Sequence, residues 1–144
     1  MSRTLSQIVG SSVLLVDSHA DSLFLTTAVL QHLQLSVIPV ASVRQAIQAL
    51  QRFDPDILIS ELRLPDEDGY ALMRKVKAHY NGRERHLPAI ALTTQTSDEA
   101  KTKALAAGFC RYLTKPYQID TLAEVLLQLS DASTQALGNC RCCA

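Results

Sequence analysis

Long apolar runs are missing from this sequence. Uninterrupted stretches such as Val13–Val16 and Ile57–Ser60 extend over about four residues, far below the roughly 20 that span a bilayer. The first dozen residues also lack an apolar stretch long enough for the core of a signal peptide. We therefore expect neither a membrane segment nor a secretory signal, and we predict a cytoplasmic protein.

An excess of charge of one sign is missing as well. The 14 Lys and Arg residues balance 14 Asp and Glu residues in a chain of 144, so the summed field gives no reason to expect attraction to nucleic acid. Apolar residues make up 47% of the chain, and no low-complexity tract interrupts it. One globular domain without direct contact to nucleic acid is expected.

Cysteines are not spread through the chain as a disulfide framework would require. Cys110 lies in an apolar stretch, whereas Cys140, Cys142 and Cys143 crowd into the last five residues. Three clustered thiols can bind a soft metal, form an intermolecular disulfide or carry a lipid. However, a second ligand pair for zinc is missing, and the last four residues begin with Arg141 rather than the cysteine of a prenylation box. A tail with none of these roles is favoured, and no metal site is predicted.

Short β-rich runs alternate with segments of helical periodicity from about residue 12 to about residue 130. Most runs are continuously apolar, as expected of parallel strands covered on both faces. They are residues 13–17, 35–40, 56–60, 89–93 and 110–113. The alternation predicts an α/β fold, a doubly wound five-stranded parallel sheet with five helices in a three-layer sandwich.

Local signals mark the helix starts and the domain limits. Ser42 with Gln45 three residues later forms a capping box, and Ser97 precedes an acidic first turn. The last helix is predicted at about residues 119–130. We divide the chain into an N-terminal extension (1–11), one domain (12–130) and a polar, cysteine-rich tail (131–144).

In such a sheet the ligand site lies at the carboxyl ends of the strands, near the switch in strand order. The residues at these ends form the candidate pocket: Asp17, Ser18, Glu61, Thr93, Thr94 and Lys115. No Gly-rich or Ser/Thr-rich phosphate loop follows the first strand, so a flavin-binding or other small-molecule domain of this topology is disfavoured.

The chain resembles the receiver domains of bacterial response regulators through VLLVDSH, DILISELRLPDEDGY, PAIALTT and YLTKPY. The step Leu64-Pro65 followed by Gly69, and Lys115-Pro116 in a cis-proline-like context, carry most of the resemblance, which covers about residues 12–130. It implies a CheY-like, flavodoxin-like fold and a non-enzymatic role in two-component signal transduction. The implied partner is a signalling protein such as a histidine kinase or an output regulator.

Three positions depart from this family. Glu61 stands where the family has its phosphoacceptor aspartate, and the added methylene moves the carboxylate by more than about 1 Å, enough to disturb in-line phosphoryl transfer. Ser18 replaces the second of two adjacent acids that hold Mg²⁺, and Thr94 replaces a very small residue. We therefore predict no resident cofactor, weak Mg²⁺ binding and no conventional phosphorylation.

Other family features are retained. Thr93 resembles the switch hydroxyl, Tyr112 the switch aromatic and Lys115 the phosphate-pairing lysine; a strand-end threonine, a half-buried core aromatic and a surface lysine are the alternatives. We predict that Glu61 and Lys115 form an ion pair. Asp17 either accepts hydrogen bonds or caps the following helix, and His19 and His32 are interpreted as surface or packing residues.

The favoured function is a stand-alone atypical receiver that acts through protein contacts. The alternative is an active phosphoacceptor that uses Mg²⁺. A pocket resembling the activated form is expected, with a hydrogen bond between Thr93 and Glu61 and an inward Tyr112 as its signs. Homodimer or partner contacts are expected on the last two helices and the fifth strand, through Ala104, Ala107, Tyr112 and Leu122.

Overall fold

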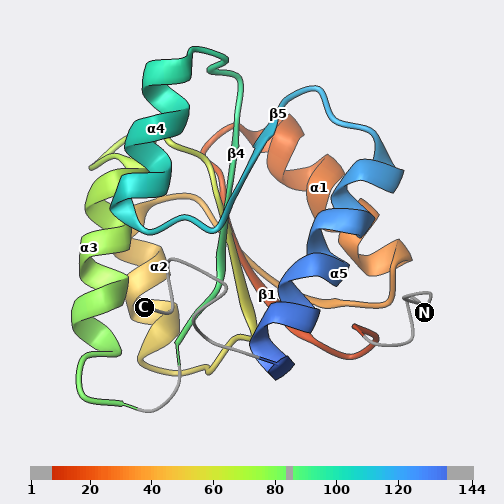
Figure 1. The fold of residues 1–144 in the computed structure, drawn as a ribbon, viewed down its shortest axis with the longest axis horizontal. Coiled ribbons are helices and arrows are strands. Elements are labelled where there is room, and N and C mark those ends of the chain that lie inside the picture. The colour runs from red at the N-terminus through yellow and green to blue at the C-terminus, as the bar shows by residue number, and fades with distance from the viewer. Residues whose placement is uncertain (1–7, 84–85, 136–144) are drawn as a thin grey trace.

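The computed structural model describes residues 8–83 and 86–135. They form one parallel sheet in the order β2-β1-β3-β4-β5 (Figure 1). The elements are β1 (Ser12–Val16), α1 (Ala20–His32), β2 (Ser36–Val40), α2 (Val43–Leu50), β3 (Ile57–Ser60), α3 (Gly69–His79), β4 (Ala89–Thr93), α4 (Asp98–Ala107), β5 (Arg111–Thr114) and α5 (Ile119–Gln135). The predicted doubly wound α/β sandwich is confirmed.

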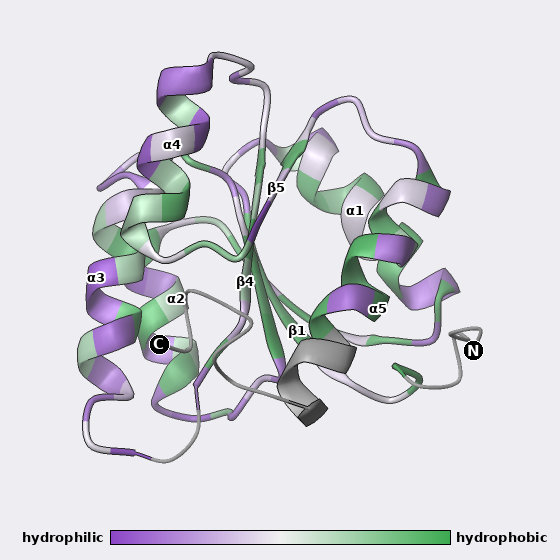
Figure 2. Cartoon of the chain, viewed as in Figure 1, coloured by the Kyte–Doolittle hydropathy of each residue, from purple (hydrophilic) through white to green (hydrophobic). Residues whose placement is uncertain are grey.

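Two helical layers sandwich the sheet: α1 and α5 cover one face, and α2, α3 and α4 cover the other (Figure 1). Successive side chains of a strand point to opposite faces, so Leu15 joins the core beneath α1 and α5, whereas Leu14 joins the core beneath the other layer. Figure 2 shows the hydrophobic strands between these layers. Within the described residues, no helix is both long and apolar enough to cross a membrane.

Side chains fix the starts of α2 and α4 as predicted. Ser42 Oγ accepts a hydrogen bond from the Gln45 N–H at 3.1 Å, and Gln45 Oε1 accepts one from the Ala41 N–H at 2.7 Å. Ser97 Oγ accepts from the Ala100 N–H at 3.1 Å. These contacts satisfy backbone donors that have no partner within the helix.

The observed elements differ from the sequence predictions mainly at the two ends of the domain. Each strand boundary lies within one residue of its predicted place, but α5 continues past residue 130 to Gln135, because no Gly or Pro interrupts that stretch. Ile8 precedes the predicted domain boundary and is nevertheless fully buried. Cys110, which directly precedes β5, is also buried. The predicted tail cysteines Cys140, Cys142 and Cys143 lie outside the described residues.

Candidate functional site

Neighbouring strand ends bring the predicted pocket residues together. The Glu61 N–H donates to the Val16 carbonyl at 2.9 Å, and the Lys115 N–H donates to the Thr93 carbonyl at 2.8 Å. The residues that follow β1, β3 and β5 therefore meet at one edge of the sheet, around a pocket of about 330 Å³. It is lined by Asp17, Ser18, His19, Ser22, Glu61, Arg63, Thr94 and Lys115.

Lys115 is the centre of a buried ionic cluster. Its Nζ lies 2.6 Å from Asp17 Oδ2 and 3.1 Å from Glu61 Oε1. The three side chains are only 13%, 4% and 10% exposed, in the order Lys115, Asp17, Glu61, so water screens their attraction weakly. The predicted pair between Glu61 and Lys115 is confirmed, and Asp17 is a second partner that the sequence did not reveal.

Asp17 is held from two further directions. Its Oδ1 accepts from the His19 N–H at 3.0 Å, and its Oδ2 accepts from the Ser22 hydroxyl at 2.6 Å. His19, not Asp17, is the N-cap of α1, since its Nδ1 accepts from the Ser22 N–H at 3.3 Å. Of the two roles considered for Asp17, accepting hydrogen bonds is therefore the one observed.

The Glu61 carboxylate turns back onto its own loop. Its Oε2 accepts from the backbone N–H groups of Leu62 and Arg63 at 2.6 and 3.3 Å. Gly69 makes this compact turn possible, because a Cβ at that position would lie 2.8 Å from the Glu61 carbonyl oxygen, closer than packed atoms approach. The Leu62 carbonyl also accepts from the Gly69 N–H at 2.8 Å.

Thr93 and Tyr112 both contact Gln95. The fully buried Thr93 accepts from the Gln95 N–H at 3.3 Å, while the half-buried Tyr112 hydroxyl donates to the Gln95 carbonyl at 2.7 Å. Burial raises the pKa of Tyr112, as do the nearby Tyr70 and Glu61, so the phenol stays a neutral donor. Tyr112 packs against the core, but within the described residues Thr93 makes no hydrogen bond to Glu61. Only one expected sign of an activated-like pocket is present.

Mg²⁺ requires oxygen ligands in near-octahedral geometry. Asp17 and Glu61 are the only acids of the pocket, and nowhere in residues 8–83 and 86–135 do three or more His, Cys, Asp or Glu side chains gather in a group that suits a metal. Each of the four carboxylate oxygens of Asp17 and Glu61 already has a partner, either an N–H or O–H donor or the Lys115 ammonium. A divalent ion that binds both acids therefore competes with Lys115 and with these N–H and O–H donors.

Two pocket residues carried no recognisable signal in the sequence. Ser22 lies in the first turn of α1 and Arg63 in the loop after β3, where it is exposed, and isolated residues of these types are common on protein surfaces. Their roles become visible only through the Ser22 hydroxyl that donates to Asp17 and the Arg63 backbone N–H that donates to Glu61.

The predicted contact face on α4, β5 and α5 requires a correction. Ala104 and Leu122 are fully buried, because they point inward to the two cores on either side of the sheet. Neither side chain is available to a partner. Ala107 and Tyr112 remain partly exposed.

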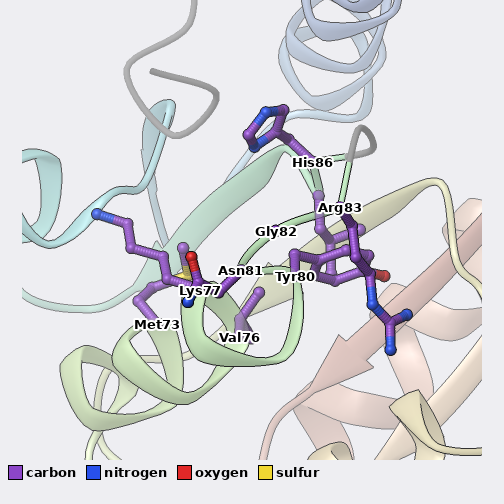
Figure 3. A pocket seen from close by; sticks show the side chains of 9 residues that line it. Met73, Val76, Lys77, Tyr80, Asn81, Gly82, Arg83 and His86 are labelled. Carbon is purple, nitrogen blue, oxygen red and sulfur yellow. The ribbon is translucent and has the colours of Figure 1, made fainter.

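A separate hollow of about 250 Å³ lies at the C-terminal end of α3 (Figure 3), and it shares no lining residue with the pocket around Lys115. Lys77, Arg83 and His86 line it. Figure 3 shows Lys77 and Arg83 extending in opposite directions, and the Arg83 guanidinium lies 5.9 Å from the Tyr80 ring centre. Because these cationic groups diverge, they do not converge on a common ligand. The pocket around Lys115 therefore remains the candidate site.

Residues 13–127 match the model of the response regulator receiver domain. A 14.6 kDa protein of Leptolyngbya boryana, which is uncharacterised, is 34% identical over 79% of this chain and 83% of its own length. The two-component response regulator ARR12 of Arabidopsis thaliana is 31% identical over 81% of this chain. The matched region is only 19% of ARR12.

Solved structures share the fold. The receiver domain of the sensor histidine kinase PA1611 from Pseudomonas aeruginosa is 32% identical, with a TM-score of 0.77 over 85% of this chain and 99% of that one. That receiver has a magnesium ion coordinated in its active-site cleft. The chemotaxis regulator CheY4 of Vibrio cholerae is 28% identical, with a TM-score of 0.74 over 84% of this chain and 99% of that chain.

Proposed function

The chain belongs to the response regulator receiver family of two-component signalling, and from this premise we propose that it works in the cytoplasm by protein contacts, without conventional phosphorylation. The observation that carries the proposal is the closed cluster in which Lys115 lies between Asp17 and Glu61. Lys115 thus neutralises part of the carboxylate charge that a bound metal ion neutralises in other members of this family. In this proposal the charge of the pocket stays the same, because neither a metal ion nor a phosphoryl group is added to it.

The position of Glu61 opposes phosphoryl transfer. An attacking carboxylate oxygen has to lie in line with the phosphorus, and misplacement by about 1 Å costs on the order of a hundredfold in rate. Here one Glu61 oxygen is bonded to backbone N–H groups and the other lies against Lys115. An incoming donor has to break these contacts before it meets a nucleophile.

We also propose that the pocket works without Mg²⁺. PA1611 binds the ion in its cleft, but this chain has Ser18 where family members carry an acid, and a neutral hydroxyl is a weak substitute for a carboxylate ligand. Ser22 adds to the effect, since its hydroxyl and Lys115 both occupy Asp17 Oδ2.

Incubation with acetyl phosphate and Mg²⁺, followed by intact-mass measurement, tests the proposal. The parent chain should remain unmodified. The matched control is the double variant Ser18→Asp with Glu61→Asp, which restores both family carboxylates and should gain the mass of one phosphoryl group. A parent chain that gains this mass, and loses it in Glu61→Gln, would establish the alternative function of an active phosphoacceptor.

A signalling protein is the proposed partner. Relatives include the hybrid signal transduction histidine kinase D of Dictyostelium discoideum and the DNA-binding transcriptional regulator NtrC of Proteus hauseri. Since the match spans 5% and 16% of these proteins, their remaining activities are not carried over. Either class, a kinase or an output regulator, fits a receiver that acts through contact.

A further inference from the structure

Cys110 is disulfide-bonded, and it lies at the edge of the sheet opposite the Lys115 pocket. It directly precedes β5, whereas Lys115 directly follows that strand. The Cys110 N–H donates to the Ala89 carbonyl at 2.8 Å, and the Arg111 guanidinium donates to the Cys110 carbonyl at 2.8 Å. These two contacts fix the backbone of Cys110 at the amino-terminal edge of the sheet.

The partner of Cys110 is one of three residues if the bond lies within the chain. The sequence contains four cysteines, and the other three are Cys140, Cys142 and Cys143. All three follow α5 and lie outside the described residues. Whether they can reach Cys110 depends on where α5 ends.

The end of α5 lies within reach of Cys110. α5 runs back along β5, toward the edge at which β5 begins (Figure 1), and Arg111 Nε donates to Gln128 Oε1 at 3.2 Å. The helix ends at Gln135, about 10 Å beyond Gln128 along its axis. The chain from Gln135 to Cys140 can span about 17 Å, so a tail that turns back covers this distance.

The side chain of Cys110 points to the face of the sheet that α5 covers. It belongs to the same core as Leu126 and Leu129 of α5, and the residue is only 7% exposed. A thiol buried in apolar surroundings is poorly accessible to other molecules. A segment that directly continues α5 is therefore better placed to bond Cys110 than a cysteine of a second molecule.

We propose that Cys110 and one cysteine of the tail form a reversible, redox-controlled disulfide that fastens the residues after α5 to the amino-terminal edge of the sheet. Disulfides are rare in reducing compartments, and those that form there are usually transient and redox-sensing. The cytoplasm that we propose for this chain is such a compartment. The disulfide is independent of the proposed function, because Cys110 does not line the pocket around Lys115.

The bond forms by thiol–disulfide exchange with a small disulfide such as glutathione disulfide. A tail thiolate, which the neighbouring Arg141 favours, attacks the oxidant, forms a mixed disulfide and releases one glutathione thiol. Cys110 then loses its proton, attacks the tail sulfur and releases the second glutathione thiol. In total the two cysteines lose two electrons and two protons, and the oxidant becomes two thiols. Excess reduced glutathione reverses both exchanges.

Tryptic mapping of the full chain tests the inference. Cleavage after Arg111 and Arg141 separates Cys110 from the tail, and Cys140 from the last two cysteines. After treatment with glutathione disulfide and alkylation of the remaining thiols, the monomer should yield a Cys110 peptide that is cross-linked to a tail peptide. The mass of the pair identifies the tail peptide, and excess reduced glutathione should abolish the cross-link.

Thermal unfolding provides a second measurement. The oxidised parent should unfold at least about 5 °C above the reduced parent, because the cross-link restricts the unfolded chain. The matched control combines Cys140→Ser, Cys142→Ser and Cys143→Ser, which leaves the buried Cys110 unchanged. Its oxidised and reduced forms should unfold at the same temperature. Cys110→Ala should abolish the cross-link as well.

Three results would overturn the inference. The first is complete alkylation of Cys110 in the oxidised parent, which includes the case of a disulfide confined to the tail. The second is a cross-link to Cys110 that occurs only in dimers, since it then joins two chains. The third is a cross-link that excess reduced glutathione does not open. Phosphorylation of Glu61 would instead overturn the proposed function, and it would leave the cross-link unaffected.

Discussion

Two carboxylates in the connection between β3 and α3 bind backbone N–H groups in different surroundings. Buried Glu61 accepts from Leu62 and Arg63 in its own loop and pairs with Lys115. Exposed Asp66 accepts from Val43 and Arg44 at the start of α2, at 3.1 and 2.9 Å. If the contacts of buried Glu61 are broken, its carboxylate is left without hydrogen-bond partners, at a high cost in free energy. If those of exposed Asp66 are broken, water hydrates its carboxylate instead.

Glu61 and Asp66 therefore anchor the same loop in two ways. The contacts of Glu61 fix the loop relative to β5 through Lys115, and those of Asp66 fix it to α2. Removing charge from the buried cluster should destabilise the chain far more than removing it from the helix start. Each of the following changes tests that difference, beginning with the largest expected effect.

Lys115→Met leaves Asp17 and Glu61 as two buried carboxylates without their shared cation. The free energy of unfolding should fall by about 3–5 kcal/mol, as is typical when one partner of a buried ion pair is removed. Urea denaturation measures the change, with Lys101→Met at an exposed position of α4 as the control. Equal losses in the two variants would contradict the buried cluster.

Glu61→Gln removes the charge at nearly constant shape, while Lys115 keeps Asp17 as a partner. The amide oxygen replaces only part of the acceptor capacity of the carboxylate, so we expect a loss of about 1–3 kcal/mol in unfolding free energy. If Glu61→Gln proves neutral, the charge of Glu61 plays no part in stability. The same variant, compared with the parent for binding of the signalling partner, then shows whether the charge matters for signalling.

Asp66→Asn should cost less, about 0.3–1 kcal/mol, because the lost charge lies at an exposed helix N-terminus. The control is Glu67→Gln next to it, which removes an exposed ion pair with Lys75 that contributes little in water. Thermal unfolding at low salt measures both variants. A cost for Asp66→Asn that equals that for Glu61→Gln would remove the contrast between the two sites.

The smallest effect is a pH dependence. Hydrogen bonds from the Arg44, Val43 and Glu67 N–H groups outweigh desolvation and lower the pKa of Asp66. A lowered folded-state pKa contributes stability that is complete above the unfolded value of about 3.9 and is lost as the pH falls through the folded value. Between about pH 5 and pH 3 the parent should therefore lose more unfolding free energy than Asp66→Asn. Parallel curves for the two proteins would show that Asp66 is not held in its charged form.

Strand positions and pocket location followed from the sequence because both rest on local patterns. Continuous apolar runs predicted the strands, Ser42 and Ser97 predicted helix starts, and the residues after each strand predicted the pocket edge. The pair between Glu61 and Lys115 was also predictable, since the resemblance to receiver domains places both side chains in one pocket.

Only the tertiary structure decided which charged groups pair and which apolar side chains are buried. The second bond of Lys115 to Asp17, the Ser22 hydroxyl on the same carboxylate and the burial of Ala104 and Leu122 depend on distances that no local pattern contains. Likewise, the sequence determined a net charge of zero. The fold placed α1 and α5, which contain no Lys or Arg, in one layer and α2, α3 and α4, which contain six, in the other, because helices far apart in the chain pack in the same layer.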